Sequence, residues 1–201
     1  MQSDVFDRSR ILNLTLVLEG GLLFVAACWI QLAQLNIVSE FVLTRKVLLI
    51  GVLGGLATAV SGFAIIFVGK LFGNSIKWIN ALRQIIYAEV APLFKDLTAA
   101  DIILIAVSSG FCEEAFFRGV MQTQIGILPT SIIFGAVHCP TPRYLSYGAW
   151  AAFAGLFLGF LKDYTNSVWA PIIAHGLSNL IVITYLRYFM KVEPPEPKKV
   201  G

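Results

Sequence analysis

Long apolar stretches dominate this chain, and most polar residues gather between them. A helix that crosses a bilayer needs about 20 predominantly apolar residues. The apolar stretches, given in chain order, are 11–35, 47–69, 101–120, 125–138, 144–161 and 164–186. The fourth is the shortest and contains Pro129. The pattern predicts an all-α, polytopic transmembrane helical bundle of about six membrane segments.

Residues 74–97, between the second and third segments, follow an amphipathic pattern. At about 100° per residue, one helical face collects apolar side chains, namely Trp78, Ile79, Leu82, Ile85, Ile86 and Val90. Lys77, Asn80 and Gln84 fall on the opposite face. We expect one interfacial amphipathic helix anchored by Trp78, although a soluble helix that caps the bundle fits the same pattern. Pro92 should end or kink this helix.

The composition excludes most soluble classes of protein. Of the 201 residues, 57% are hydrophobic and 13% are charged, whereas soluble domains carry about 25% charged residues. The net charge of +3 comes without a basic stripe interleaved with aromatic residues, so no nucleic-acid partner is expected. The three cysteines show neither a disulfide framework nor a zinc-knuckle spacing. The chain is therefore expected to be an integral membrane protein whose surroundings are the lipid bilayer.

The distribution of basic residues predicts the orientation. With six crossings, one side collects Arg8, Arg10, Lys70, Lys77, Arg83, Lys95, Arg143, Arg187, Lys191, Lys198 and Lys199, and the other collects Arg45, Lys46 and Lys162. If the fourth segment crosses fully, this bias places both termini in the cytoplasm, in a bacterial inner membrane or an organellar one. If the fourth segment is re-entrant, the later loops change sides. The first segment is too long for a cleavable signal peptide and is expected to stay as an anchor.

The chain divides into three parts on this basis. Residues 1–100 would form N-terminal membrane helices with the interfacial helix, and 101–190 a catalytic helical core. The Pro- and Lys-rich tail, 191–201, is expected to be disordered.

Five ionisable residues lie within or beside the predicted membrane segments, where such groups are costly and mark function: Glu113, Glu114, Arg118, His138 and His175. Glu114 and Arg118 are four residues apart, so they share a helical face and can form an ion pair. Glu113 points elsewhere, lacks a local cation and would be the reactive carboxylate.

Two further pairs repeat the four-residue spacing. Phe134 and His138 put an aromatic ring beside an imidazole, and His175 and Asn179 put two hydrogen-bond donors on one face. A carboxylate, an imidazole and such donors can activate water and hold an oxyanion. Hydrolysis of an acyl bond is the reaction that they suggest.

Three motifs in order carry a resemblance to a known family. They are EEAFFR at 113–118, FGAVH at 134–138 and HGLSN at 175–179, which span about 67 residues. The sequence of EExxxR, FxxxH and HxxxN resembles the CPBP family of intramembrane peptidases, which includes the type II CAAX prenyl endopeptidases and the bacterial bacteriocin-processing and immunity ("Abi") proteins. A single motif would be weak, whereas three in order on apolar segments are specific.

The resemblance implies roles for these residues. Glu113 would be the general base that activates water, and His138 would hold or polarise that water. His175 and Asn179 would stabilise the oxyanion, while Glu114, Arg118 and Phe134 would support these groups. The implied activity is hydrolysis of peptide bonds in membrane-associated or lipidated substrates.

Metal dependence has two interpretations. Zinc could use Glu113, His138 and His175 as three ligands and leave a fourth position open. The sequence has no HExxH motif, however, and one carboxylate cannot be both ligand and free base. No metal cofactor is therefore expected, and zinc is kept as the alternative.

Other functions stay open at the level of the sequence. A catalytically silent family member could act as a binding or assembly factor for membrane proteins. A bis-histidine haem protein or an ion-translocating bundle is a third class. Glu19, alone in the first segment, is expected to face the bundle interior and is assigned no role. The partner expected is a peptide or membrane-protein substrate, and the sequence does not define the oligomeric state.

Overall fold

A computed structural model describes residues 7–72 and 76–190, and this part of the chain is helical without a strand. The first half contains α1 (Arg8–Ala33), η1 (Val38–Glu40), α2 (Arg45–Phe72), α3 (Lys77–Ile85), η2 (Ile86–Val90) and α4 (Ala91–Leu93). The second half contains α5 (Ala99–Glu114), η3 (Ala115–Met121), α6 (Gln122–Ile125), α7 (Ile127–Val137), η4 (Pro142–Tyr144), α8 (Leu145–Thr165) and α9 (Trp169–Tyr188). The predicted disordered tail, 191–201, lies outside the described residues.

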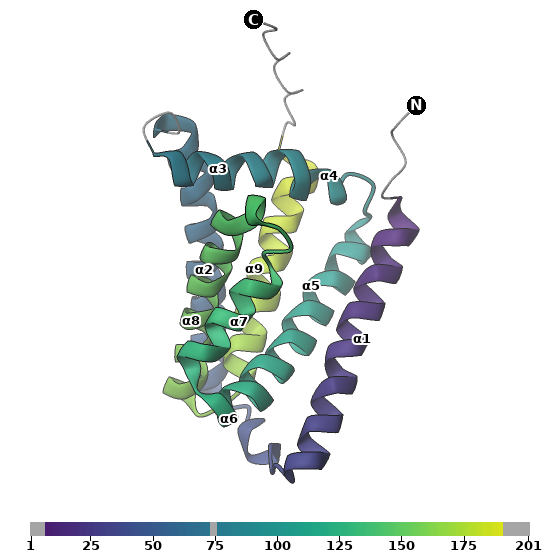
Figure 1. The fold of residues 1–201 in the computed structure, drawn as a ribbon, viewed down its shortest axis with the longest axis vertical. Helices are drawn as coiled ribbons and strands as arrows, with labels where there is room; N and C mark the ends of the chain where they lie inside the picture. The colour runs from purple at the N-terminus through teal and green to yellow at the C-terminus, as the bar shows by residue number, and fades with distance from the viewer. Residues whose placement is uncertain (1–6, 73–75, 191–201) are drawn as a thin grey trace, which may run out of the picture.

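The long helices run up and down one bundle (Figure 1). The first turn of α1 and the last turn of α9 lie at the same end, where α3 crosses the bundle and continues into η2 and α4. Helix α9 packs against both α2 and α5, and α7 packs against α8. Helix α1 contacts α5 and η3 and stands at the edge of the bundle in Figure 1. Helix α9 is thus central, and α1 is peripheral.

The predicted all-α membrane bundle is confirmed. Four helices are long and apolar enough to cross a membrane: Arg8–Ala33, Arg45–Leu71, Pro142–Thr165 and Trp169–Tyr188. Helix α5 continues through η3 and α6, so this element is also long enough, although it carries four charged residues. Helix α7 has 11 residues and rises only about 16 Å, short of the roughly 30 Å of the hydrocarbon core. The fourth segment is therefore helical over only part of the crossing, and the residues after Val137 lead on to Arg143, which pairs with Glu89 at the α3 end.

The turn before α7 explains why Pro129 does not break that helix. Gly126 ends α6 with φ +83°, a conformation that L side chains rarely adopt. Helix α7 starts at the next residue, so Pro129 lies in its first turn. A proline is tolerated there because the amide it lacks would have no intrahelical acceptor.

A polar cap joins the first turns of α1 and α5. The Thr98 side chain accepts a hydrogen bond from the Asp101 amide, while the Asp101 carboxylate accepts from the Thr98 amide, which forms a capping box at the start of α5. Arg8 donates two hydrogen bonds to the same carboxylate, at 2.6 and 2.8 Å. This fork ties α1 to α5 at one end of the bundle.

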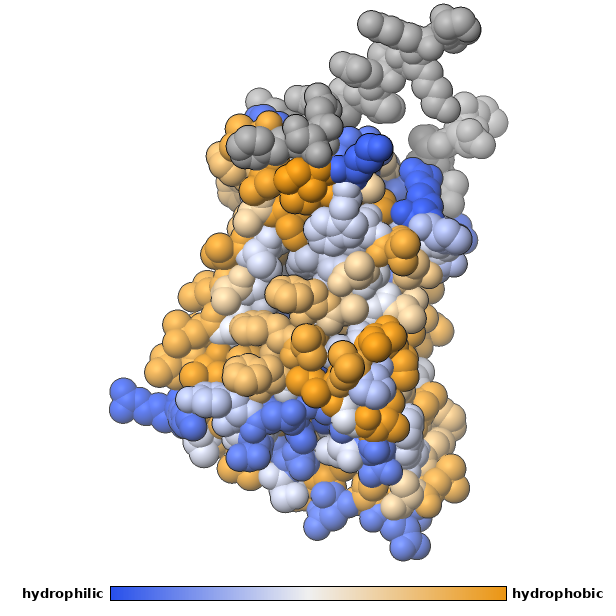
Figure 2. Space-filling model, turned by 60° about the vertical axis from the view of Figure 1, so that its left-hand side comes forward, coloured by the Kyte–Doolittle hydropathy of each residue, from blue (hydrophilic) through white to orange (hydrophobic). Residues whose placement is uncertain are grey.

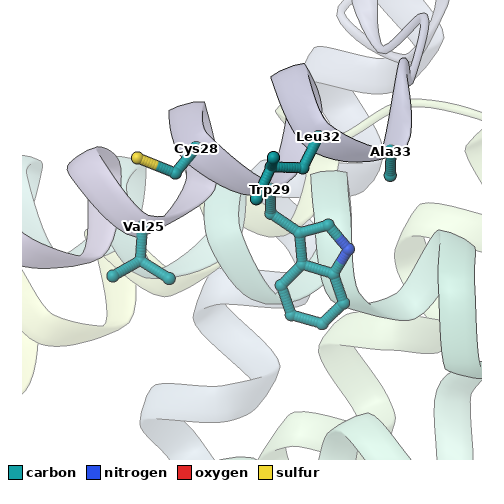
Figure 3. Close-up of a pocket in the computed structure, with 5 residues that line it drawn as sticks. All are labelled: Val25, Cys28, Trp29, Leu32 and Ala33. Carbon is teal, nitrogen blue, oxygen red and sulfur yellow. The ribbon is translucent and has the colours of Figure 1, made fainter.

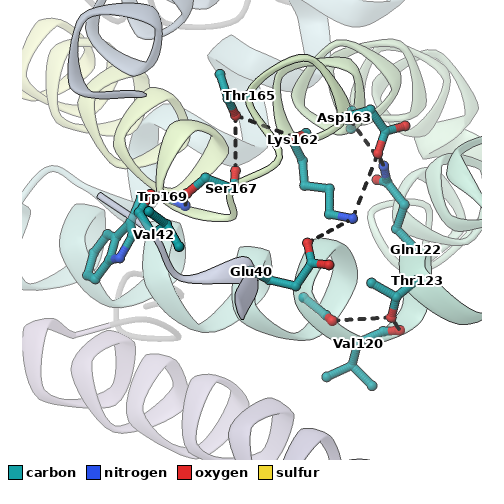
Figure 4. A network of polar contacts seen from close by, with 12 residues as sticks. Glu40, Val42, Val120, Gln122, Thr123, Lys162, Asp163, Thr165, Ser167 and Trp169 are labelled. Carbon is teal, nitrogen blue, oxygen red and sulfur yellow. Dashed lines mark hydrogen bonds and ion pairs between the residues drawn. The ribbon is translucent and has the colours of Figure 1, made fainter. Parts of the chain in front are cut away.

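A second polar network closes the opposite end (Figure 4). The Lys162 ammonium lies 3.0 Å from a Glu40 oxygen, and the Gln122 side chain donates to Asp163 at 2.9 Å. The Ser167 hydroxyl donates to the Val42 carbonyl at 2.8 Å. The contacts of Glu40 and Val42 hold the α1–α2 connection against the end of α8 and the turn that follows it, and the Gln122–Asp163 bond joins α6 to α8.

The surface fits a bilayer environment. On the face in Figure 2, hydrophobic residues cover most of the middle, and hydrophilic residues gather mainly toward the two ends. Exposed apolar side chains also line α1, including Phe24 and Leu32. The chain is therefore an integral membrane protein. In one predicted set of basic residues, Arg8 begins α1 and Lys70 lies in the last turn of α2, whereas in the other Arg45 begins α2 and Lys162 lies in the last turn of α8. These helix ends lie at opposite ends of the bundle. Lys191, Lys198 and Lys199 fall outside the described residues.

The amphipathic stretch lies across one end of the bundle, as Figure 1 shows for α3. Leu82 and Ile85 are buried, and Trp78 is exposed. The helix ends at Leu93, directly after Pro92, as the sequence predicts. The exposed indole at the end of an apolar bundle is typical of an interfacial helix.

Candidate active site

The candidate site is centred on a change of helical pitch. Helix α5 ends at Glu114, and the chain continues as a π-helix through η3. Glu114 and Arg118 are both 0% exposed, and Arg118 Nε lies 3.2 Å from Glu114 Oε2. Nε and Oε2 are close enough for an ion pair, but their geometry is not that of a hydrogen bond. Arg118 Nη1, in contrast, donates a hydrogen bond to Glu114 Oε1 at 3.4 Å. The predicted ion pair is confirmed, in a π-turn of the kind that often marks functional sites.

Arg118 is held on two further sides. Its Nη2 donates to the Gly155 carbonyl of α8 at 2.9 Å. Its guanidinium carbon lies 4.6 Å from the centre of the Phe134 ring. A side chain at Gly155 would collide with this arrangement, because an added Cβ would lie 3.0 Å from Arg118 Nη2 and 3.1 Å from the Phe134 ring. The ion pair is therefore built into the contact between η3, α7 and α8.

His175 of α9 reaches the same carboxylate. Its Nδ1 lies 2.8 Å from Glu114 Oε1. The ion-paired carboxylate can only accept, so Nδ1 carries the proton and Nε2 is left for another partner. The contact depends on close packing of α5 on α9, since a Cβ at Gly110 would lie 2.6 Å from the Gly176 amide nitrogen. Two glycines therefore bring Glu114 and His175 together.

His138 follows a similar pattern at the C-terminal end of α7. Its Nδ1 donates to the Phe134 carbonyl at 2.7 Å, which again leaves Nε2 free for a water or a substrate. The Phe134 ring lies 4.6 Å from the His138 ring and 6.1 Å from the His175 ring, measured between centroids. The Phe134 ring therefore lies beside both imidazole rings.

Asn179 lies one turn beyond His175. Its side-chain amide bonds to a residue outside the three sequence motifs. Its Nδ2 donates to the Ser109 hydroxyl of α5 at 2.9 Å. The second amide proton of Nδ2 remains for another acceptor. Sequence reasoning missed Ser109, because a serine in an apolar helix has many structural uses and no motif marks it.

Glu113 has a different environment from its neighbour. Its Oε2 is buried and has no hydrogen-bond partner among the described residues. It acts electrostatically on Glu19 of α1 and on Tyr147 of α8. Neither residue was assigned a role from the sequence, although an acid inside an apolar segment is a recognisable signal. Glu19 does face the bundle interior, as predicted.

The zinc alternative requires three side chains to converge. Within the described ranges, no three His, Cys, Asp or Glu residues form a group that could hold a metal ion. The suggested ligands Glu113, His138 and His175 are thus not gathered into such a group.

A surface hollow lies on α1. It is lined by α1 side chains alone, namely Val25, Cys28, Trp29, Leu32 and Ala33 (Figure 3). Trp29 packs edge-on against Phe116 of η3, with ring centroids 6.2 Å apart. None of the predicted site residues lines this hollow.

Comparison with known proteins agrees with the motif analysis. Residues 95–181 match the family model described as type II CAAX prenyl endopeptidase Rce1-like. The three motifs all fall inside this segment, so the resemblance is confirmed for that part of the chain.

Two proteins of Bacillus subtilis (strain 168) are similar to the chain. "Uncharacterized protein YpbD" is 32% identical over 101 residues, which are 48% of this chain and 51% of that protein. "Putative membrane peptidase YdiL" is 29% identical over 113 residues, which are 56% of this chain and 38% of that protein. The chain thus spans about half the length, or less, of these curated relatives. No solved structure shows a significant match.

Proposed function

From the match of residues 95–181 to the Rce1-like family of type II CAAX prenyl endopeptidases, we propose that this chain is an intramembrane endopeptidase. Its substrates would be membrane-associated or lipidated polypeptides. The observation that supports this most is the contrast between two adjacent glutamates. Glu114 is locked by Arg118 and His175, whereas Glu113 Oε2 is buried without a partner. One carboxylate is structural, and the other is available for a proton.

In the proposed first step, Glu113 takes a proton from a water molecule. The water oxygen forms a bond to the carbonyl carbon of the substrate, and the carbonyl becomes a tetrahedral oxyanion. His138 would hold the water through Nε2, because its Nδ1 is committed to the Phe134 carbonyl. A positioned base of this kind typically contributes about 10²–10⁴-fold to the rate.

In the second step, the oxyanion is held by His175 and Asn179. For His175 this requires a proton on Nε2 as well as on Nδ1, so the imidazolium is the stabilising form. The Glu114 carboxylate at Nδ1 compensates its charge. The uncommitted amide proton of Asn179 supplies the second donor. Glu113 then returns its proton to the amide nitrogen as the carbon–nitrogen bond breaks.

The proposal is tested by peptide cleavage in detergent, followed by mass spectrometry. The library should contain matched peptides with and without a prenylated cysteine. We expect defined products from the wild-type chain that persist after treatment with EDTA, because the proposed chemistry uses no metal. Loss of all products in EDTA, with recovery on adding zinc, would contradict the metal-free mechanism.

A binding or assembly role is the alternative function. It would be favoured if purified wild-type protein bound peptides of the library and cleaved none of them. The buried ion pair and the histidine contacts would then serve the fold alone.

We further propose that the bundle end carrying α3 faces the cytoplasm, in a bacterial inner membrane or an organellar one. Arg8, Arg83 and Arg143 lie at this end, which fits the positive-inside rule. A fluorescent protein fused after residue 201 should then fluoresce in a bacterial host. A fusion to alkaline phosphatase that is active instead would reverse the orientation.

A further inference from the structure

Glu19 stands out on α1 because of where it lies along the helix. The side of α1 that packs on the bundle carries Ile11, Leu22, Ala26, Trp29 and Ile30. Glu19 lies on the same side, in the middle of the helix, and is 8% exposed. Around this position the packed side of α1 is otherwise apolar except for Thr15, one turn before Glu19. A carboxyl group therefore occupies a place where packing alone favours a hydrocarbon side chain.

No partner within the described part of the chain accounts for this carboxyl group. Glu19 Oε2 is buried and makes no hydrogen bond there. The charged groups that act on it are Glu113, a second acid, and His175, whose Nδ1 is already hydrogen-bonded to Glu114. Burial of a polar group without a hydrogen bond destabilises a fold, because the group loses its hydration and gains no partner. A purely structural role would thus weaken the fold that it serves.

The neighbours of Glu19 are the groups assigned to catalysis. Helices α1 and α5 start at the same end of the bundle, joined by the Arg8–Asp101 fork. Glu19 is the twelfth residue of α1, and Glu113 is the fifteenth of α5. At about 1.5 Å per residue, the two lie at similar depths. Each carries a buried Oε2 that lacks a hydrogen-bond partner.

Resting on the proposed function, we propose that Glu19 is a positioning residue that holds the hydrolytic water together with Glu113. A water needs two to four polar partners when it is buried, and two unsatisfied carboxyl oxygens provide them. An ionised carboxyl accepts a hydrogen bond from water, and a protonated one can donate, so the pair can hold the water in either state. Glu19 breaks and forms no covalent bond. It fixes the oxygen that Glu113 activates.

Kinetics of two variants test this role. Glu19→Leu should lower kcat by about 100-fold, the order expected when a reacting group loses its position, and should change KM by less than about twofold. Glu19→Gln should recover a large part of kcat, because a carboxamide still hydrogen-bonds water. Gly20→Ala is the matched control, since that position is exposed and an added Cβ meets nothing within 4 Å. It should match the wild type.

The pattern of loss separates positioning from packing. Glu19→Leu is expected to melt at or above the wild-type temperature, so the loss of kcat cannot come from unfolding. Wild-type kcat in Glu19→Leu, while Glu113→Gln is inactive, would overturn the role of Glu19 and leave the proposed function intact. An increase confined to KM would likewise overturn it.

A second measurement does not depend on turnover. A crystal structure of the full chain in a lipidic mesophase, at a resolution that places waters, should show a water within hydrogen-bond distance of Glu19 and Glu113. A direct hydrogen bond between the two carboxyl groups, or a water that is hydrogen-bonded to Glu113 and not to Glu19, would overturn the proposal. The crystal structure tests the role of Glu19 even if the wild-type chain cleaves no peptide. An absence of cleavage would contradict the proposed function only.

Discussion

Replacing Arg118 by alanine should destabilise the folded bundle by about 3–5 kcal/mol, the usual cost of removing one partner from a buried ion pair. The cause is the charge left behind. Glu114 is fully buried, and Arg118 contacts both of its oxygens. The change also removes the hydrogen bond to the Gly155 carbonyl and the contact with the Phe134 ring. Thermal unfolding in detergent, followed by the fluorescence of the buried aromatic residues, measures the effect.

Arg143→Ala is the matched control for this change. Arg143 also pairs with a glutamate, since its Nη2 lies 2.7 Å from Glu89 Oε1, but its side chain is 67% exposed. Exposed ion pairs contribute about 0–1 kcal/mol, so the melting temperature should barely move. Equal decreases in melting temperature for the two variants would show that the buried ion pair stabilises the fold no more than the exposed one.

Replacing Glu113 by glutamine should abolish turnover and leave the fold intact. The carboxamide cannot take a proton from water, so the rate should fall by about 10²–10⁴-fold. Stability should be kept because Glu113 Oε2 has no hydrogen-bond partner to lose in the described structure. Cleavage rates and melting temperatures of the same preparations provide the two readouts, and Glu89→Gln, at a half-buried glutamate that pairs with Arg143, serves as the control for a glutamate substitution.

The two glutamate substitutions should therefore differ in their effect on stability. Glu114→Gln removes the charge between Arg118 and His175, and should lower stability and turnover together. If Glu113→Gln retained full turnover and His175→Gln lost it, the base would be the neutral His175 imidazole, oriented by Glu114. The proposed division of labour between Glu113 and Glu114 would then be wrong.

Local spacing predicted those features that depend on one segment of chain. Apolar length was enough for α1, α2, α8 and α9, because a bilayer demands long apolar helices. The four-residue spacing was enough for the Glu114–Arg118 pair, which survives the change from α-helix to π-helix because both pitches bring these positions close together.

Contacts between different helices could not be predicted from the sequence. The hydrogen bond between His175 and Glu114 depends on the close approach of α5 to α9 at Gly110 and Gly176. The residue pattern of a single helix does not predict which other helix lies against it. The same holds for Asn179 with Ser109. The partial crossing by α7 reflects its early end at Val137, in a segment whose hydropathy alone suggested a span.

The central claim is that a water activated by Glu113 breaks a peptide bond. Its most direct test is cleavage of one identified peptide in ¹⁸O-labelled water by the full chain in proteoliposomes, with mass spectrometry of the products. The account predicts one ¹⁸O atom in the new terminal carboxylate for the wild type and no labelled product for Glu113→Gln. Labelled product from Glu113→Gln at the wild-type rate would contradict it.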